Sequence, residues 1–329
     1  MTAPAGNPLV TLLSGGVGGA KLALGFYTAF DPARLTIIAN NGDDMEHFGL
    51  RICPDWDILA YTLAGRVEAA QGWGIAGDTF AALDVVRELG GSDWFNLGDR
   101  DLGLHLFRTG LLRQGVGLSE VCRRVAGRLG LKCALLPMCT QPMETRIGTD
   151  AGEMHLQEYM VRHRTEPEVR SIRFEGSDSA TPAPGVLEAI AGSQVIVLAP
   201  SNPLISIDPI LAVPGLREAL RSTQAYRMAV SPLVAGASLK GPTDKMMAQL
   251  GLEVSPVTLA GRYRDVLDLF VLDRQDRHLM GEVEQLGMKC AALPTVMGDL
   301  AAKQALARAL LDLWGSFRPG TAAFSGAAS

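Results

Sequence analysis

Short apolar runs alternate with longer amphipathic stretches along most of this chain. Continuous apolar runs are typical of strands buried on both faces, and the stretches between them carry helical spacing. The predicted strands are Val10–Leu13, Leu35–Asn40, Leu131–Leu136, Val195–Pro200, Tyr226–Ser231, Leu269–Leu272 and Cys290–Val296. The predicted helices are Lys21–Phe30, Asp57–Gly65, Thr79–Leu89, Asp99–Leu112, Leu118–Leu129, Gly185–Ala191, Gly215–Arg221, Thr243–Gly251, Gly261–Asp268 and Leu300–Trp314. This alternation predicts an α/β fold, a largely parallel sheet with helices on both faces.

The segment 138–184 differs in composition from the rest of the chain, because it is richer in Glu, Arg, Thr and His. Short strands are suggested at Glu144–Gly148, His155–Arg162 and Val169–Phe174. We expect an inserted cap subdomain there, within a single α/β nucleotide-binding domain over residues 1–329. The small, polar stretch Gly315–Ser329 is expected to form a flexible tail.

A glycine cluster follows the first predicted strand and leads directly into a helix. It reads Ser14-Gly15-Gly16-Val17-Gly18-Gly19-Ala20-Lys21. Glycines let a backbone approach a phosphate closely, and the free N–H groups and dipole of the helix favour an anion. The spacing matches neither a P-loop nor a strict G-x-G-x-x-G, and Leu22 after Lys21 leaves no Ser or Thr hydroxyl for a metal as in a P-loop. The alternative is a turn that only joins strand to helix.

An acidic loop follows the second predicted strand. The stretch from Asn40 to Asp57 contains four aspartates, Asp43, Asp44, Asp55 and Asp57. Oxygen ligands suit Mg²⁺, which usually takes one or two carboxylates together with phosphate oxygens and water. The alternative gives these aspartates to Asx-turns and to a helix N-cap. His47, in the same loop, is a candidate acid–base group or ligand contact, or else a hydrogen-bonding surface residue.

Aromatic residues stand among glycines and carboxylates in Gly72–Thr79 and again in Asp93–Asp101. Such a mixture suits a planar ring that carries hydroxyl groups. The alternative makes Trp73, Trp94 and Phe95 core residues, with Asp99 or Asp101 capping a helix.

A further polar cluster, Ser201-Asn202-Pro203, follows the strand at Val195–Pro200. The amide of Asn202 offers both a donor and an acceptor to the edge of a nucleobase, although a simple turn is an equal alternative. Because the polar clusters follow strands of one parallel sheet, we expect them to meet at its carboxyl edge.

Composition narrows the class of protein. A net charge of −5 and the absence of a basic run with interleaved aromatics argue against nucleic-acid binding. The five cysteines are widely spaced and form no C-x-x-C pair, which predicts thiols in a reducing compartment. The N-terminus lacks a signal-peptide pattern, and no apolar run approaches the roughly 20 residues of a membrane span. We expect a cytoplasmic protein that does not bind membranes.

Taken together, the clusters resemble the 2-phospho-L-lactate transferase (CofD) family of coenzyme F-420 biosynthesis. The resemblance runs from about residue 9 to 275, and only the combination of motifs is specific. It rests on Leu13–Ala20, Gly42–Asp44, His47–Asp57, Gly72–Gly74, Asp78–Thr79, Asp93–Phe95, Leu97–Leu102, His155–Tyr159, Leu198–Pro203 and Ile210–Gly215.

The resemblance implies a Rossmann-like enzyme, often dimeric, that joins a phosphorylated three-carbon acid to the deazaflavin Fo. The donor is a guanosine diphosphate ester of lactate, enolpyruvate or glycerate. The terminal ribityl hydroxyl of Fo attacks the acid-bearing phosphorus, GMP leaves, and Mg²⁺ is required. The sequence does not distinguish the three acids.

Roles follow for the candidate residues. Phosphate and nucleotide binding is assigned to Ser14, Gly15, Gly16, Gly18, Gly19, Lys21, Ser201, Asn202 and Pro203. Catalysis is assigned to Asp43, Asp44, Asp55 and Asp57, with the metal held among Asp43, Asp44 and Asp57. Contact with the deazaflavin is assigned to His47, Trp73, Asp78, Thr79, Asn96, Asp99 and Arg100.

Two other function classes were weighed. A related subgroup resembling gluconeogenesis factors shares the glycine turn and binds nucleotide-sugars as a regulator. A nicotinamide dehydrogenase would close the second strand with an acidic residue for the ribose, whereas Asn40-Asn41 end this one.

Overall fold

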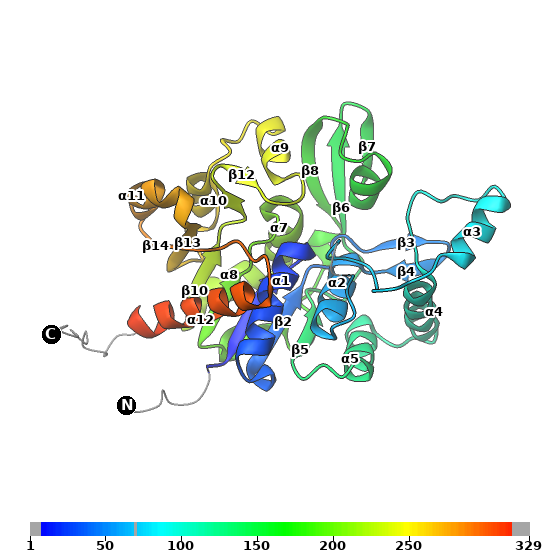
Figure 1. The fold of residues 1–329 in the computed structure, drawn as a ribbon, viewed down its shortest axis with the longest axis horizontal. Helices are drawn as coiled ribbons and strands as arrows, with labels where there is room; N and C mark the ends of the chain where they lie inside the picture. The colour runs from blue at the N-terminus through cyan, green and yellow to red at the C-terminus, as the bar shows by residue number, and fades with distance from the viewer. Residues whose placement is uncertain (1–7, 69–70, 318–329) are drawn as a thin grey trace.

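The centre of the molecule is a seven-stranded parallel sheet (Figure 1). Its strand order is β14-β13-β10-β9-β1-β2-β5. The computed structural model describes residues 8–68 and 71–317. The strands are β1 (Val10–Ser14), β2 (Leu35–Ala39), β5 (Ala134–Pro137), β9 (Val195–Leu198), β10 (Tyr226–Val230), β13 (Leu269–Asp273) and β14 (Lys289–Leu293). Each of the seven predicted strands is present, and the α/β fold is confirmed.

Both faces of this sheet are covered, which explains the continuous apolar runs. Along β1, Leu12 packs into one core cluster and Leu13 into the other. The same alternation places Ile37 and Ile38 of β2 on opposite faces. A strand that is buried on both sides needs apolar residues at successive positions, whereas a one-sided strand would alternate with polar residues.

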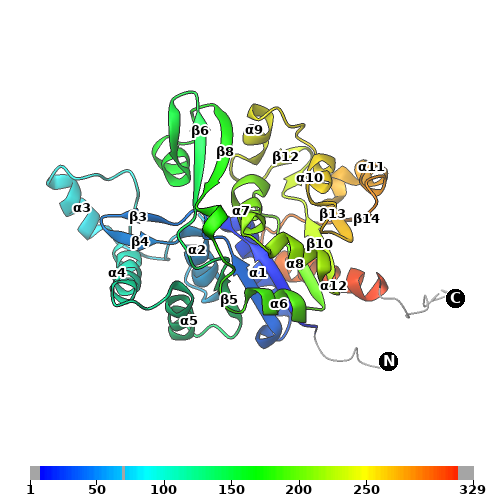
Figure 2. The same cartoon turned by 180° about the vertical axis from the view of Figure 1, so that it is seen from behind.

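Helices form the outer layers. They are α1 (Gly16–Ala29), α2 (Pro54–Leu63), α3 (Ala81–Glu88), α4 (Asp99–Arg113), α5 (Leu118–Arg128), α6 (Val186–Gly192), α7 (Asp208–Ala212), α8 (Leu216–Ser222), α9 (Thr243–Gln249), α10 (Pro256–Tyr263), α11 (Met280–Glu284) and α12 (Leu300–Phe317). Helices α1, α2, α5 and α12 cover one face, and α6, α7, α8 and α10 lie on the other (Figures 1 and 2). Short helical turns are η1 (Pro32–Arg34), η2 (Glu158–Arg162), η3 (Ser177–Ser179), η4 (Pro203–Ile207) and η5 (Arg274–Leu279).

The chain order reverses at β1. From β1 the sheet grows outward through β2 and β5 on one side, and later through β9, β10, β13 and β14 on the other. The loops after β1 and β9 therefore leave the sheet in diverging directions and open a crevice between them. Ligands of open α/β sheets bind at such a switch point, outside the carboxyl ends of the strands.

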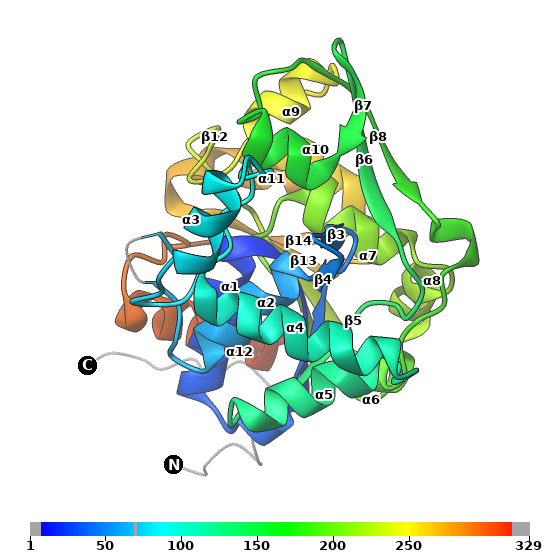
Figure 3. The same cartoon turned by 90° about the vertical axis from the view of Figure 1, so that its right-hand side faces the viewer.

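A second, antiparallel sheet lies above the carboxyl edge, in the order β7-β6-β8 (Figure 3). Its strands are β6 (Glu144–Thr149), β7 (Gly152–His155) and β8 (Val169–Glu175). The prediction of a strand over His155–Arg162 is wrong, because β7 ends at His155 and a π-helical turn, η2, follows. Ile147 and Val169 join the same apolar cluster as Leu13 of the main sheet. Whether 138–184 is an inserted subdomain stays a prediction.

Two hairpins were not predicted, β3 (Met45–His47) with β4 (Leu50–Ile52), and β11 (Leu233–Val234) with β12 (Ala237–Ser238). Their strands are too short to leave a periodic pattern. Several helix bounds also differ from prediction. Helices α1 and α2 begin earlier, at Gly16 and Pro54, and the prediction of a helix over Gly261–Asp268 is wrong, because α10 ends at Tyr263.

Residues 315–317 of the predicted tail belong to α12, and residues 318–329 lie outside the described residues. All five cysteines are buried free thiols. Among the described helices, none has the length and apolarity needed to cross a membrane.

Candidate functional site

A pocket of about 710 Å³ opens at the switch point of the sheet. The loops after β1, β2, β9 and β10, the first turn of α2 and the segment 156–164 line it. The predicted site residues that line it are Gly15, Gly16, Gly18, Lys21, Asp43, Asp55, Asp57, Trp73, Asn96, Ser201 and Asn202. Ser14, Gly19, Asp44, His47, Asp78, Thr79, Asp99, Arg100 and Pro203 are not among the lining residues.

The glycine turn is packed tightly against the loop that follows β9. The N–H of Gly15 donates to Ser201 Oγ at 3.2 Å, and Ser201 Oγ donates to the Gly15 carbonyl at 2.7 Å. A Cβ at Gly18 would clash with the Pro200 carbonyl, and one at Gly19 would clash with the hydroxyls of Ser14 and Ser201. Gly18 and Gly19 are therefore required by packing alone, and Ser14 lies beneath the turn rather than in the pocket.

The N-terminus of α1 nevertheless faces the pocket. Gly16, Val17 and Gly18 of its first turn line the cavity together with Lys21. The first N–H groups of a helix lack intrahelical partners, and the dipole there favours negative charge. One of these donors, the N–H of Gly16, is bound by Asp55 Oδ1 at 2.7 Å. The burial of Lys21 and the nearby Lys240 lower the pKa of the Lys21 ammonium.

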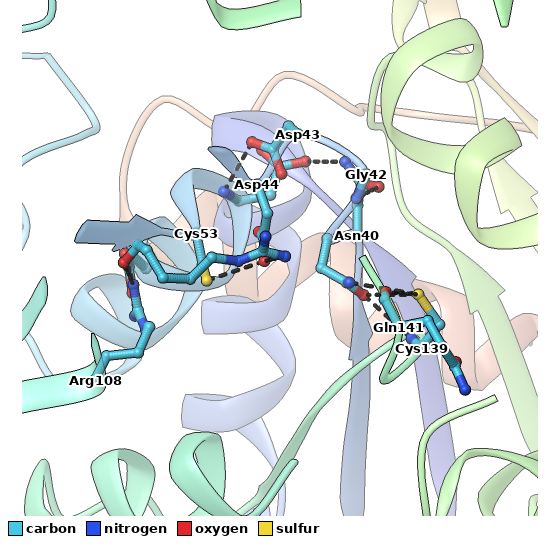
Figure 4. Close-up of polar contacts among 12 residues, drawn as sticks. Asn40, Gly42, Asp43, Asp44, Cys53, Arg108, Cys139 and Gln141 are labelled. Carbon is cyan, nitrogen blue, oxygen red and sulfur yellow. Dashed lines mark hydrogen bonds and ion pairs between the residues drawn. The ribbon is translucent and has the colours of Figure 1, made fainter. Parts of the chain in front are cut away.

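Asp43 and Asp55 form a pair of buried carboxylates at this point, and Figure 4 shows Asp43 beside Asp44 in the acidic loop. Asp43 Oδ2 accepts from the N–H of Asp55 and from Gln157 Nε2, both at 3.1 Å. Asp43 Oδ1 has no hydrogen-bond partner among the described residues. Burial and the neighbouring Asp55 raise the pKa of Asp43 well above its usual value. An unpartnered buried carboxylate oxygen that lines a pocket is available to a ligand or cation.

Asp55 is more fully satisfied than Asp43. Besides Gly16, it accepts a hydrogen bond from Asn40 Nδ2 at 2.9 Å. Burial raises its pKa to about 6, although these hydrogen bonds oppose that rise. Asp55 therefore holds the acidic loop, the end of β2 and the start of α1 in one arrangement.

Asp44 and Asp57 serve buried or half-buried arginines instead. Asp44 Oδ2 accepts from Arg51 and from the thiol of Cys53, each at 3.0 Å, and the residue does not line the pocket. Both oxygens of Asp57 bind the guanidinium of Arg108, which is fully buried. The expectation that these two aspartates hold a metal therefore does not fit their surroundings, because each already balances a cation.

A magnesium ion fits Asp43 better. No three His, Cys, Asp or Glu side chains are grouped around a possible ion in the described part of the chain. Mg²⁺ does not require such a cage, because one or two carboxylates commonly bind it together with substrate phosphates. The free Oδ1 of Asp43, beside a helix N-terminus suited to phosphate, meets that requirement.

Asn202 presents half of its amide to the pocket. Its Oδ1 accepts from the N–H of Leu204 at 2.9 Å and caps η4, whereas Nδ2 has no partner among the described residues. Pro203 lies outside the pocket, where its carbonyl accepts from the buried hydroxyl of Tyr263. Asn202 combines the predicted turn role with a free donor.

An aromatic wall closes another side of the cavity. Trp73, Trp94 and Phe95 line the pocket, and 47% of Trp73 is exposed. His47 lies behind this wall, with its ring against Trp94 and Phe95, and burial lowers its pKa. His47 therefore supports the wall, and its assignment to direct ligand contact is not supported by its position.

Asp78 and Asp99 cap helices rather than face a ligand. Asp78 Oδ1 accepts from the N–H groups of Thr79 and Arg100 at the start of α4. Asp99 accepts from the N–H groups of Ala81 and Ala82 at the start of α3, and from the Thr79 hydroxyl. The alternative of a capping role is confirmed for Asp99. Thr79 and Arg100 belong to this network, and none of the four residues lines the pocket.

Several residues that line the pocket were not predicted from the sequence. Tyr61, His105, Gln157, Arg164 and Lys240 all reach the pocket. The spacing of Asp57 and Tyr61, four residues apart on α2, could have identified Tyr61, because such residues share a helix face. Arg164 and Lys240 stand in irregular loops and carry no such signal.

Asp101, the last residue of the predicted aromatic and acidic stretch Asp93–Asp101 and a possible cap, also lines the pocket. It accepts a hydrogen bond from the hydroxyl of Tyr61 at 2.6 Å. Burial raises its pKa to about 6, and burial lowers the pKa of the nearby His105 to about 4.

Comparison with known proteins gives a consistent result. A family model described as 2-phospho-L-lactate transferase CofD matches residues 10–304. A phosphoenolpyruvate transferase from Kitasatospora aureofaciens is 40% identical over 95% of this chain and 99% of its own length. A 2-phospho-L-lactate transferase from Methanosarcina mazei is 35% identical over 92% of this chain and 99% of its own. A UPF0052 family protein from Bacillus halodurans shares the fold at a TM-score of 0.58 and 14% identity, covering 92% of this chain and 98% of its own.

Proposed function

The chain belongs to the 2-phospho-L-lactate transferase (CofD) family, and from that premise we propose the reaction that its pocket performs. The proposed donor is a guanosine diphosphate ester of a three-carbon acid, and the proposed acceptor is the terminal hydroxyl of the deazaflavin Fo. The hydroxyl oxygen forms a bond to the acid-bearing phosphorus, the bond from that phosphorus to GMP breaks, and GMP leaves. The product is a precursor of coenzyme F-420.

The observation that carries this proposal is the unpartnered Oδ1 of Asp43 beside the N-terminus of α1. In-line phosphoryl transfer needs mainly positioning and charge stabilisation. The first turn of α1, apart from the N–H of Gly16 that Asp55 binds, would hold the diphosphate together with Lys21, and Asp43 Oδ1 would hold Mg²⁺. When bound, that ion supplies positive charge against the phosphate oxygens.

Asp55 is the proposed acceptor of the hydroxyl proton. Its pKa of about 6 brings its proton affinity close to neutral pH, which suits a general base. Its hydrogen bonds to Gly16 and Asn40 fix the carboxylate beside the diphosphate site. Trp73, Trp94 and Phe95 would enclose the deazaflavin ring.

For the transferred acid we propose the enolpyruvate group. A relative from Streptomyces griseus that is 41% identical is also named phosphoenolpyruvate transferase, whereas the named 2-phospho-L-lactate transferase is 35% identical. The experiment supplies Fo, Mg²⁺ and each of the three guanylated acids in turn, and follows the deazaflavin by mass spectrometry. We expect a heavier deazaflavin, formed fastest from the enolpyruvate donor. No product from any donor at high enzyme concentration would refute the proposed reaction.

Guanine is proposed to lie at Asn202, whose free Nδ2 can donate to the base edge. Asn202→Ser keeps an oxygen that can cap η4 and removes the Nδ2 donor without adding a charge, whereas Asn202→Ala also removes the cap. Calorimetry with GDP and ADP should show reduced discrimination in both variants. Tighter binding of UDP-glucose or NAD than of GDP would favour the regulatory or dehydrogenase alternatives.

We also propose a cytoplasmic homodimer. Helices α3 and α4 lie at the edge of the molecule (Figure 1). Val85 of α3, Leu89 at its C-terminal end, and Leu106 and Phe107 of α4 expose apolar side chains. Apolar surface of this kind is typical of an interface between subunits. Sedimentation of wild-type protein and of Leu89→Glu/Leu106→Glu tests it, because the substitutions should shift the protein toward the monomer.

A further inference from the structure

The turn that follows η2 is strained. Arg164 and Thr165 have φ angles of 48° and 61°, a left-handed region that non-glycine residues rarely occupy. A π-helical turn, itself uncommon and often found at functional sites, immediately precedes them. Strain of this kind persists only where the surroundings hold it in place.

The surroundings do hold this turn. The N–H of Thr165 donates to the Tyr159 carbonyl at 2.8 Å, and the Tyr159 hydroxyl donates to the Thr165 carbonyl at 3.3 Å. Lys245 of α9 donates to the same carbonyl. Tyr159 is completely buried, so the turn is tied to the core rather than loosely placed.

Arg164, at this strained turn, is an exposed residue that lines the pocket. Arg164 is the only arginine among the described lining residues. No hydrogen bond or ion pair involves its guanidinium in residues 8–68 and 71–317, whereas Arg162, two residues earlier, pairs with Glu158 at 3.6 Å. An unpaired guanidinium in a pocket leaves its planar set of donors available to a ligand.

The same segment also reaches the acidic pair. Gln157 donates to Asp43, and Arg164 lies seven residues further along the same wall of the pocket. Both residues line the pocket, and the hydrogen bond from the Thr165 N–H to the Tyr159 carbonyl turns the chain back over η2. A donor whose reacting phosphorus lies near Asp43 would therefore extend its acid toward Arg164, while α1 and Lys21 hold the diphosphate.

We propose that Arg164 is the specificity-determining residue that binds the carboxylate of the transferred three-carbon acid. This inference rests on the proposed function for the identity of the donor. A guanidinium binds a carboxylate through two parallel hydrogen bonds, which a lysine ammonium cannot reproduce. Arg164 thus distinguishes the donor from GDP, which has the diphosphate and lacks the carboxylate.

The test compares the binding of guanylated phosphoenolpyruvate with that of GDP by calorimetry, with Mg²⁺ and without Fo, so that no turnover is needed. In Arg164→Met the preference for the donor over GDP should fall roughly 10- to 100-fold, the range of a lost charge-assisted contact. The affinity for GDP should stay within about twofold, and Arg164→Lys should retain only part of the preference. Arg162→Met, on the same segment and outside the pocket, should leave both affinities unchanged.

A second pair of variants separates recognition from structure. Arg164→Gly relieves the left-handed strain and should not lower the thermal midpoint, yet it should lose the donor preference as Arg164→Met does. Thr165→Gly relieves strain next to it and should keep the preference. A lower midpoint in Arg164→Gly with an unchanged preference would mean that the arginine is structural, and would overturn the inference.

Three further outcomes would also test whether Arg164 binds the carboxylate. An equal loss of GDP and donor affinity in Arg164→Met would place the guanidinium on the diphosphate and overturn the assignment, and so would an unchanged preference. Wild-type protein that forms no deazaflavin product yet shows the Arg164-dependent preference would refute the proposed reaction and leave carboxylate recognition standing.

Discussion

The backbone N–H of Asp55 donates to Oδ2 of Asp43 at 3.1 Å, so a buried carboxylate of the loop after β2 and one of the first turn of α2 are held side by side at the pocket. This contact orients Asp43 so that its other oxygen has no partner among the described residues. Because burial penalises the charge on both groups, the folded protein maintains an unfavourable arrangement that a cation would relieve.

Asp43→Asn and Asp55→Asn should each lower the rate of product formation at least about a hundredfold, because each removes a charge at the reacting phosphate and keeps the shape. The two should differ in their metal response. Asp43→Asn should raise the Mg²⁺ concentration needed for half-maximal rate, whereas Asp55→Asn should lower the maximal rate at unchanged metal requirement. Full activity in both variants, or activity that survives EDTA in wild-type protein, would contradict the assignment.

Asp57→Asn should destabilise the fold by about 3–5 kcal/mol, because it leaves the buried guanidinium of Arg108 without its carboxylate. Urea denaturation measures this change. The double variant Asp57→Asn/Arg108→Met should recover part of the lost stability, because it removes the uncompensated charge. If Asp57→Asn folded as stably as wild-type and lost only its response to Mg²⁺, Asp57 would be a metal ligand after all.

Asp101 should make stability depend on pH. Its pKa rises from 3.8 to about 6 in the folded protein, so the folded state holds this proton more tightly than the unfolded chain does. The sign follows: relative to Asp101→Asn, wild-type protein should lose stability as pH rises from about 4 to 6, by on the order of 1–3 kcal/mol. Thermal denaturation of both proteins across that range measures it. Parallel curves would show that Asp101 is not buried as described.

Asp99 provides a test of capping against ligand contact. Asp99→Ala removes the acceptor for the first N–H groups of α3 and should lower the thermal midpoint, whereas Asp99→Asn keeps one acceptor oxygen and should lower it less. Both variants should leave the KM for Fo within about twofold. A large rise in that KM with an unchanged midpoint would restore Asp99 to the deazaflavin site.

The sheet was predictable because its strands are buried on both faces. Leu12 and Leu13 must both be apolar when helices cover each side, and such runs are visible in a single sequence. The sequence also indicated that the loops carrying Gly15, Asp43 and Asn202 would meet, since parallel strands end at one edge.

The sequence alone could not predict which side chains bind one another within the site. Asp43 and Asp57 look alike in the sequence, and only the fold shows that Arg108, on α4, neutralises Asp57 while Asp43 keeps a free oxygen. Gly18 likewise resembles a phosphate-binding glycine, yet the Pro200 carbonyl from a distant loop already forbids a side chain there. Arg164 was missed because its position depends on a strained turn held by Tyr159 and Lys245.

The most direct test of the account is the identity and amount of the nucleotide released. With wild-type protein, Fo, Mg²⁺ and the guanylated enolpyruvate donor, chromatography should show GMP and the heavier deazaflavin in equal amounts, because the acid-bearing phosphorus is attacked. Release of GDP, or consumption of the donor with Fo unchanged, would contradict it.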